Sequence, residues 1–242
     1  MGLTIDWLNI RCVIFDVDGT LYDKRIMRKF MFGELWRHAI TRPAHWKDLR
    51  VIKVFREQRI GHRFDEVECL DKSQYEWAAR RCHVSADAVR EIVTEWMYVR
   101  PLKYLARCKH DHLDDFLRAL EDRGIPTAVF SDYPTTEKLN VLDVSVTQAV
   151  CATDSAVNRL KPNPRGLHYL ADLLRVQPDE CVYIGDEEEL DAECARRAGM
   201  HYLILRAGKA NRPGYFQNYV DLTNQIIAAG SGGTETDRPK PK

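Results

Sequence analysis

Five short apolar runs constrain the fold of this chain more than any other feature. The runs are rich in β-branched and aromatic residues, and several of them end at a polar residue. Continuous apolar runs of this length are typical of strands in a parallel sheet covered on both faces. Helical patterns separate most of them, which predicts a doubly wound α/β core. The predicted strands span residues 11–16, 127–131, 149–152, 181–186 and 201–206.

Helical periodicity is clear between the predicted strands. Leu113, Phe116, Leu117 and Leu120 form one apolar stripe, and Gly124 follows as a plausible C-cap. We therefore expect a helix that packs this stripe against the sheet. Further helices are expected at residues 136–142, 165–174 and 192–198.

The interval from Lys24 to Arg100 has almost no strand signal. Its clearest apolar stripe runs from Ala88 to Met97, and Ser85 precedes it as an N-cap. We predict a helical insert of about four helices between the first two strands. The last residues are Gly, Ser, Thr, Pro and charged residues without an apolar anchor, which predicts a flexible tail. The expected division is an α/β core of residues 1–23 and 101–227, a helical domain of residues 24–100 and a tail of residues 228–242.

Composition and charge narrow the function classes. The 36 Lys and Arg residues balance 36 Asp and Glu residues, so the basic excess of a dedicated nucleic-acid-binding protein is missing. No apolar run approaches the ~20 residues that cross a bilayer, and the N-terminus lacks the features of a signal peptide. The 7 cysteines are dispersed and form no CxxC pair. We therefore expect reduced thiols in a cytoplasmic protein that binds neither membranes nor nucleic acid.

Carboxylates follow two of the predicted strands. Asp16 and Asp18 end the first strand, and Gly19 lets the chain turn. Asp186 ends another strand, and Asp191 follows after three Glu residues. These acids could be a solvated turn and a helix N-terminus enriched in acids. Alternatively, because the carboxyl ends of parallel strands meet at one edge, they could hold a hard cation such as Mg²⁺.

Two further positions supply a hydroxyl group and a positive charge. Ser131 ends the second predicted strand, and Lys161 stands just before a predicted helix. Taken singly, the serine could be a helix cap and the lysine a surface charge. Four successive places nevertheless supply an acid pair, a hydroxyl, an ammonium group and a second acid pair in that order. Chance explains such an ordered set poorly.

These residues resemble the four motifs of the haloacid dehalogenase superfamily, on its phosphatase side. DVDGTLYD resembles the first motif, FSDYP the second, LKPNP the third and GDEEELD the fourth. The resemblance covers about residues 10–23 and 101–222. It implies a Rossmann-like core, and the predicted insert sits where this superfamily places its helical cap.

The resemblance also implies a role for each motif residue. Asp16 would be the nucleophile that forms an aspartyl-phosphate, and Asp18 the general acid and base. The chain departs from the family's second motif at Asp132, because other residue types are frequent after the serine. In the fourth motif, Asp186 and Asp191 have the longer of the spacings that occur in the family, so Glu187 is a possible substitute metal ligand. Mg²⁺ would be held by Asp16, the Asp18 carbonyl and Asp186, with Asp191 supporting it directly or through water, and the phosphoryl oxygens by Ser131 and Lys161.

The function implied is a Mg²⁺-dependent phosphatase for a small phosphorylated metabolite, such as a sugar phosphate or a small phosphorylated acid. Asp18 argues against a dehalogenase, which needs no acid at this position. A phosphonate hydrolase would need a Schiff-base lysine in the insert, and nothing singles one out. Two alternatives stay open: a phosphomutase of the β-phosphoglucomutase kind, and a catalytically silent binding protein of the same fold.

Substrate choice is expected to lie in the insert, since the motifs handle only the phosphoryl group. Its many basic and aromatic residues could be a solvated helix face with Trp36 in its core, or a rim that attracts an anion. The chain enters the insert at Tyr22–Asp23 and leaves it at Arg100–Pro101, and we expect hinges there. The rim residues are Arg25, Arg28, Trp36, His38, His45, Trp46, Arg50, Arg56, Arg59, His62 and Arg63.

Overall fold

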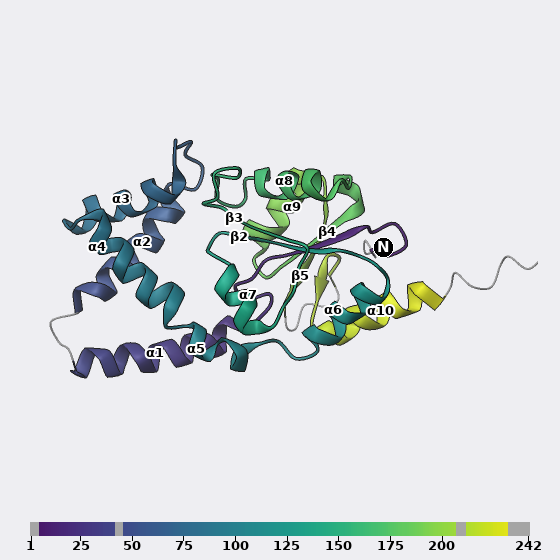
Figure 1. The fold of residues 1–242 in the computed structure, drawn as a ribbon, viewed down its shortest axis with the longest axis horizontal. Coiled ribbons are helices and arrows are strands. Elements are labelled where there is room, and N and C mark those ends of the chain that lie inside the picture. Colours follow the sequence, from purple (N-terminus) through teal and green to yellow (C-terminus); the bar gives the residue numbers. More distant parts are fainter. Residues whose placement is uncertain (1–4, 42–45, 207–211, 232–242) are drawn as a thin grey trace, which may run out of the picture.

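The fold is built on one parallel sheet of six strands in the order β3-β2-β1-β4-β5-β6. The computed structural model describes residues 5–41, 46–206 and 212–231 (Figure 1). All five predicted strands are confirmed, and a short sixth strand that the sequence did not reveal extends one edge. The strands are β1 (Cys12–Phe15), β2 (Thr127–Ser131), β3 (Gln148–Cys151), β4 (Cys181–Gly185), β5 (His201–Leu205) and β6 (Tyr215–Phe216).

The register of the central strands aligns the polar residues that follow them. Phe15 of β1 lies beside Val129 of β2 and Ile184 of β4. The Asp16 N–H continues this ladder by donating to the Ile184 carbonyl at 2.8 Å. The chain therefore leaves the three strands at one edge of the sheet, where a doubly wound fold binds its ligands.

Helices cover both faces of the sheet because neighbouring residues of each strand point to opposite sides. Val13 and Phe15 pack in one apolar cluster with α6, α7 and α10. Cys12 and Ile14 pack in a second cluster with α8 and α9. The helices predicted in this region are confirmed. Their bounds are α6 (Leu113–Asp122), α7 (Thr136–Leu142), α8 (Arg165–Leu174), α9 (Glu193–Ala198) and α10 (Tyr219–Ser231), with short turns η4 (Pro178–Glu180) and η5 (Glu188–Ala192).

The insert between β1 and β2 is helical, as predicted. Phe55, Tyr75, Val89 and Val93 form its own apolar cluster, which joins α2, α3 and α4. Ser85 caps α4 by accepting a bond from the Ala88 N–H at 3.1 Å. The elements are α1 (Lys24–Thr41), α2 (Trp46–Gly61), α3 (Leu70–Cys82), α4 (Ala86–Val93) and the π-helix η2 (Thr94–Val99), followed by α5 (Leu102–Leu105) and η3 (Ala106–Cys108).

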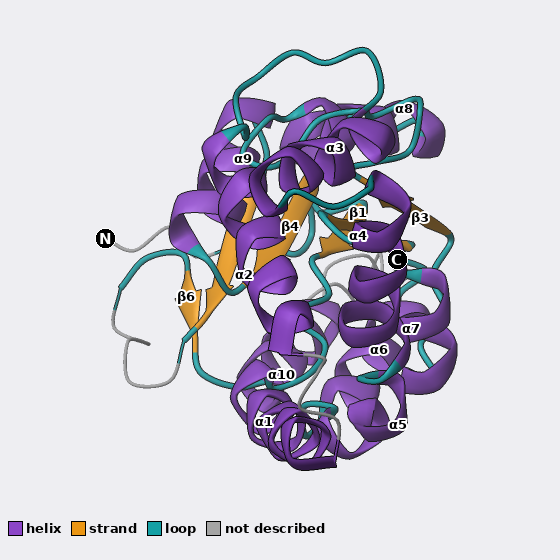
Figure 2. Ribbon diagram, turned by 90° about the vertical axis from the view of Figure 1, so that its left-hand side faces the viewer, coloured by secondary structure: helices purple, strands orange, loops and turns teal. Residues whose placement is uncertain are grey.

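Helix α1 lies apart from the bundle of α2, α3 and α4 and packs toward the core (Figures 1 and 2). It meets the rest of the insert at His38, whose Nε2 lies 3.9 Å from Oδ2 of Asp48 in α2 and whose ring centre lies 4.9 Å from that of Trp96 in η2. The Phe30 ring stacks on the Tyr104 ring with a centroid separation of 4.6 Å. The interpretation that puts Trp36 in the core of the insert is wrong, since this side chain is 63% exposed. The reason is that α1 turns a different face toward the rest of the protein.

The C-terminal part departs from the expected tail at one point. Helix α10 continues to Ser231, so residues 228–231 are its last turn rather than part of a tail. The helix is anchored by Tyr219 and Ile226, which are buried in the core. Residues 232–242 lie outside the described residues. Within the described ranges, no helix is both long enough and apolar enough to span a bilayer.

Candidate active site

Asp16 lies at the centre of the strand edge and is 5% exposed. Its position follows from β1, because it is the first residue after the central strand. The Lys161 ammonium donates to Asp16 Oδ1 at 2.6 Å, and the Thr20 hydroxyl donates to Oδ2 at 3.3 Å. A buried carboxylate is thus held by a cation and a hydroxyl donor.

Lys161 bridges two carboxylates. Its ammonium group also donates to Asp191 Oδ1 at 2.9 Å, and the whole residue is 3% exposed. Burial opposes its charge, but Asp16 and Asp191 together hold the pKa of Lys161 well above its ordinary value. Lys161 therefore stays cationic and neutralises part of the negative charge at the site.

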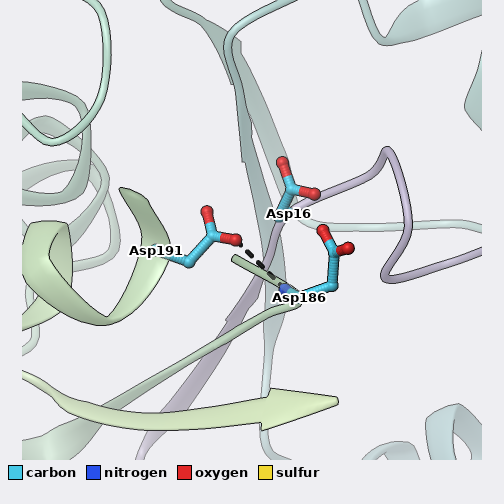
Figure 3. Close-up of side chains that lie close together, drawn as sticks. All are labelled: Asp16, Asp186 and Asp191. Carbon is cyan, nitrogen blue, oxygen red and sulfur yellow. Dashed lines mark hydrogen bonds between the residues drawn. The ribbon is translucent and has the colours of Figure 1, made fainter. Parts of the chain in front are cut away.

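Asp191 organises the loop after β4. Its Oδ2 accepts a bond from the backbone N–H of Asp186 at 3.1 Å (Figure 3). The same oxygen accepts a bond from the backbone N–H of Glu187 at 2.9 Å. Gly185 allows this arrangement, because a Cβ there would lie 2.3 Å from Asp191 Cβ. The two aspartates of the fourth motif thus have different roles. Asp191 binds backbone N–H groups and thereby fixes the position of Asp186.

Asp186 faces Asp16 across the site (Figure 3). It forms an ion pair with Lys24 at the start of α1, and Lys24 also donates to Glu187 Oε1 at 2.7 Å. Burial raises the pKa of Asp186 to about 6, although Lys24 opposes the shift. Gly19 has φ of +108° and lies so close to Asp186 that a Cβ would be 2.5 Å from Oδ2. A side chain at Gly19 would displace this carboxylate.

Asp18 is held by two donors of different kinds. Lys138 of α7 donates to its two carboxylate oxygens at 2.6 and 2.7 Å, and the Tyr22 hydroxyl donates to Oδ1. Burial alone would raise the pKa of Asp18, but Lys138 and Tyr22 outweigh it and lower the pKa. In this arrangement Asp18 is an ionised carboxylate.

The electrostatic environment of Asp16 differs from that of Asp18. Burial is the largest effect and raises the pKa of Asp16 to about 7 against the opposing charge of Lys161. The negative charges of Asp191, Asp18 and Asp186 raise it further. Two carboxylates that lie close together are thus tuned in opposite directions, which is typical of catalytic pairs.

The end of β2 brings Ser131 and Asp132 to the same edge. The Ser131 hydroxyl accepts a bond from the Tyr133 N–H at 3.2 Å, which leaves its own proton to donate. Asp132 Oδ1 accepts a bond from the Lys161 backbone N–H at 3.0 Å. The departure at Asp132 therefore has a local use, because this carboxylate positions the loop that carries Lys161.

The donor set fits a hard divalent cation. One carboxylate oxygen from each of Asp16, Asp186 and Asp191 lies within 4.8 Å of the others. Oxygen ligands of this kind suit Mg²⁺. Asp191 accepts bonds from a lysine and from two backbone N–H groups, whereas each Asp16 oxygen has one donor among the described residues and Asp186 pairs with Lys24. Asp16 and Asp186 are therefore better placed to meet an ion directly. Glu187, the possible substitute ligand, bonds Lys24 instead.

Two site residues escaped the sequence reasoning. Lys138, which follows the second motif by four residues, bonds Asp18, and Lys24, which directly follows the first motif, bonds Asp186. A signal for Lys138 existed, because it lies on the buried stripe of α7 with Leu139 and Leu142. A lysine on the apolar face of a helix needs a buried partner. Nothing comparable marked Lys24.

A cavity of about 770 Å³ lies over this edge of the sheet. We call it the insert cleft; its walls come from α1, α2 and η2, and its floor includes Asp18, Asp132 and Lys138. Of the predicted rim residues, four line the cleft and five do not, whereas His45 and the Trp46 side chain lie outside the described part. The four are Arg28, Arg56, Arg59 and Arg63, and the five are Arg25, Trp36, His38, Arg50 and His62.

Comparison with known proteins places this geometry in a family. The family model of haloacid dehalogenase-like hydrolases matches residues 10–199. Phosphoglycolate phosphatase from Escherichia coli is 29% identical over 216 residues, which cover 83% of this chain and 82% of that protein. Glyceraldehyde 3-phosphate phosphatase from Methanopyrus kandleri is 45% identical over 49 residues, which cover 20% of this chain and 21% of that protein.

Solved structures share the fold at lower identity. A 2-haloacid dehalogenase from Pseudomonas syringae has a TM-score of 0.62 and 17% identity, covering 90% of this chain and 98% of its own. A Bacillus subtilis HAD-hydrolase bound to magnesium has a TM-score of 0.63 and 12% identity, covering 90% and 99%. The chain belongs to the haloacid dehalogenase-like hydrolases. The family expected from the four motifs is thereby confirmed, and so are the doubly wound core and the helical insertion expected from the apolar patterns.

Proposed function

We propose that this protein is a Mg²⁺-dependent phosphatase that hydrolyses a small phosphomonoester through an aspartyl-phosphate on Asp16. One observation carries the proposal: a buried carboxylate bonded to Lys161 lies two residues from a second carboxylate bonded to Lys138. A carboxylate can approach a phosphate dianion only when cations offset their repulsion. The names of the curated relatives support the same reaction class.

The reaction has two steps in this proposal. In the first, an Asp16 oxygen attacks phosphorus, and the bond from phosphorus to the ester oxygen breaks while Asp18 gives that oxygen a proton. In the second, Asp18 takes a proton from water, which attacks phosphorus and breaks its bond to Asp16. Phosphate leaves, and Asp16 is free again. Lys138 keeps Asp18 in the ionised form that the second step uses. Because Asp18 donates a proton in the first step, a proton must reach it before that step begins.

The remaining groups bind and orient. Lys161 and Ser131 would hold phosphoryl oxygens, and Lys161 also offsets the charge of Asp16. Mg²⁺ would be held by Asp16 and Asp186, with the Asp18 carbonyl as a third ligand and Asp191 behind them. When bound, it supplies positive charge that stabilises the phosphoryl oxygens in the transition state.

The setting of the reaction follows from other features. We assign residues 1–23 and 101–227 to the catalytic core and residues 24–100 to a cap whose cleft admits the substrate. The cysteines are unpaired, which supports a reducing compartment such as the cytoplasm. A phosphorylated metabolite is the expected partner, whereas membranes and nucleic acid are not.

The test is phosphate release from a panel of phosphomonoesters by the wild-type protein and by Asp16→Asn. Each ester is assayed with Mg²⁺ and with EDTA, and circular dichroism checks that the variant is folded. We expect metal-dependent release that Asp16→Asn abolishes. Substantial activity in the folded variant would overturn the mechanism. Transfer of the phosphoryl group within a sugar, without phosphate release, would favour the mutase.

A further inference from the structure

The insert cleft is lined by much more than the phosphoryl-transfer residues. Its volume of about 770 Å³ lies in the range of sites that bind drug-sized ligands. Of the charged site residues described above, Asp18, Lys24, Asp132, Lys138 and Glu187 line it, and they are a small part of the lining. The walls therefore meet the part of a substrate that lies beyond the phosphate.

Helix α1 turns an apolar face to the cleft. Met27, Met31 and Leu35 line it at spacings of four residues, and Phe32 lies beside Met31. Met27 is 6% exposed, whereas Phe32 at the outer end is 70% exposed. The apolar lining that α1 contributes thus ranges from a buried to a largely exposed side chain.

Helix α2 and the segment after α4 complete the walls. Leu49, Ile52 and Ile60 of α2 line the cleft, and Ile60 is 60% exposed. Met97 of η2 and Leu105 of α5 line it as well. Apolar groups from four helices therefore surround one hollow, where a compact polar acid would leave them facing water.

Arginines of α2 and of the turn that follows it lie among these apolar residues. Arg59 is 3% exposed, and its guanidinium donates to the Asp132 carbonyl at 2.6 Å and lies 4.5 Å from the centre of the Tyr133 ring. Arg63 has a buried Nε for which no hydrogen-bond partner exists among the described residues. The cleft thus combines positive charge, which attracts a phosphate ester, with apolar walls, which attract its organic part.

We propose that the substrate is a phosphomonoester of a sizeable apolar alcohol, with a ring or hydrocarbon body that packs between α1, α2 and η2. Its phosphate enters past Asp18 on the floor of the cleft to reach Asp16, which lies behind that floor. This substrate class rests on the proposed phosphatase function and narrows it. A two-carbon phosphorylated acid such as phosphoglycolate would touch only the floor.

The experiment compares 1-naphthyl phosphate with phosphoglycolate, each with Mg²⁺. We expect kcat/KM for the naphthyl ester to be about tenfold higher or more, mainly through a lower KM, because burial of one large apolar group contributes about that much. Phe32→Ala combined with Ile60→Ala should raise KM for the naphthyl ester about tenfold and leave KM for phosphoglycolate unchanged. Both side chains are largely exposed, so the fold should tolerate their loss.

Phe64→Ala is the matched control. Phe64 is 73% exposed, close to the 70% of Phe32, but it does not line the cleft. It should leave both KM values unchanged. A preference of the wild-type protein for phosphoglycolate, or equal effects of the Phe32 and Phe64 substitutions, would overturn the substrate class while the phosphatase function stands.

A binding measurement separates the two proposals if no ester is hydrolysed. Calorimetric titration would compare 1-naphthylmethylphosphonate with methylphosphonate, neither of which has a cleavable ester bond. Tighter binding of the naphthyl compound, weakened about tenfold by the Phe32 and Ile60 substitutions, would support the apolar cleft although the phosphatase function had failed. Equal affinities would overturn the cleft proposal.

Discussion

Glu34 fastens α1, which carries one wall of the insert cleft, to the segment where the chain returns to the core. Its side chain is 6% exposed and accepts bonds from the Tyr104 hydroxyl at 2.6 Å and from Lys103 at 2.7 Å. Arg37 donates at 3.0 Å, and Arg100 lies at 3.5 Å. Because the negative charge holds all four partners, Glu34→Gln should weaken this junction.

The size of the effect follows from the pKa of Glu34. The bond from Lys103, followed by that from Tyr104, lowers this pKa from 4.5 to about 2. A shift of that size corresponds to about 3 kcal/mol. The side chains of Lys103 and Arg37 are 46% and 69% exposed, so solvent screens part of their interaction with Glu34. We expect Glu34→Gln to lower the free energy of unfolding by about 2 kcal/mol at pH 7.

The sign of the pH dependence is fixed by the lowered pKa. Ionised Glu34 stabilises the folded protein fully above pH 4.5, and this contribution is lost as pH falls from there toward 2. Urea unfolding of the wild-type and Glu34→Gln proteins between pH 7 and pH 3 would measure the difference. It should shrink as the solution becomes more acidic.

Glu76→Gln provides the control for this measurement. Among the residues that the structure describes, the ion pair of Glu76 is with Lys72, at 3.6 Å, and the Glu76 side chain is 38% exposed. Exposed pairs of this kind contribute less than about 1 kcal/mol. The reasoning would be refuted if Glu34→Gln cost no more than Glu76→Gln, or if its cost at pH 3 equalled that at pH 7.

Three further predictions concern the site. Gly185→Ala should raise the calorimetric Kd for Mg²⁺ about tenfold, because the added Cβ displaces Asp191; an unchanged Kd would contradict this. Lys138→Met should move the acidic limb of the pH–rate profile to higher pH, since burial then raises the pKa of Asp18; a limb that stays in place would separate Lys138 from Asp18. Addition of Mg²⁺ to EDTA-treated protein should raise Tm, and no change would argue against the carboxylate cluster as its site.

Much of the core could be predicted from local patterns. The apolar runs identified five strands within about a residue of their ends, because strands covered on both faces need continuous apolar sequence. The strand β6 has only two residues and gave no pattern. The positions of Asp16, Ser131 and Asp186 at one edge followed from parallel pairing, since parallel strands bring their carboxyl ends together.

The sequence alone determined which groups gather at that edge, because each of them directly follows a strand or precedes a helix. Only the tertiary structure decided how their charges are paired. Lys138 reaches Asp18 across 120 positions of the chain, and Lys24 reaches Asp186 from the first turn of α1. The apolar character of the insert cleft likewise depends on how α1 and α2 face each other. Long-range pairings of this kind leave no periodicity in the sequence, because they depend on how whole helices pack.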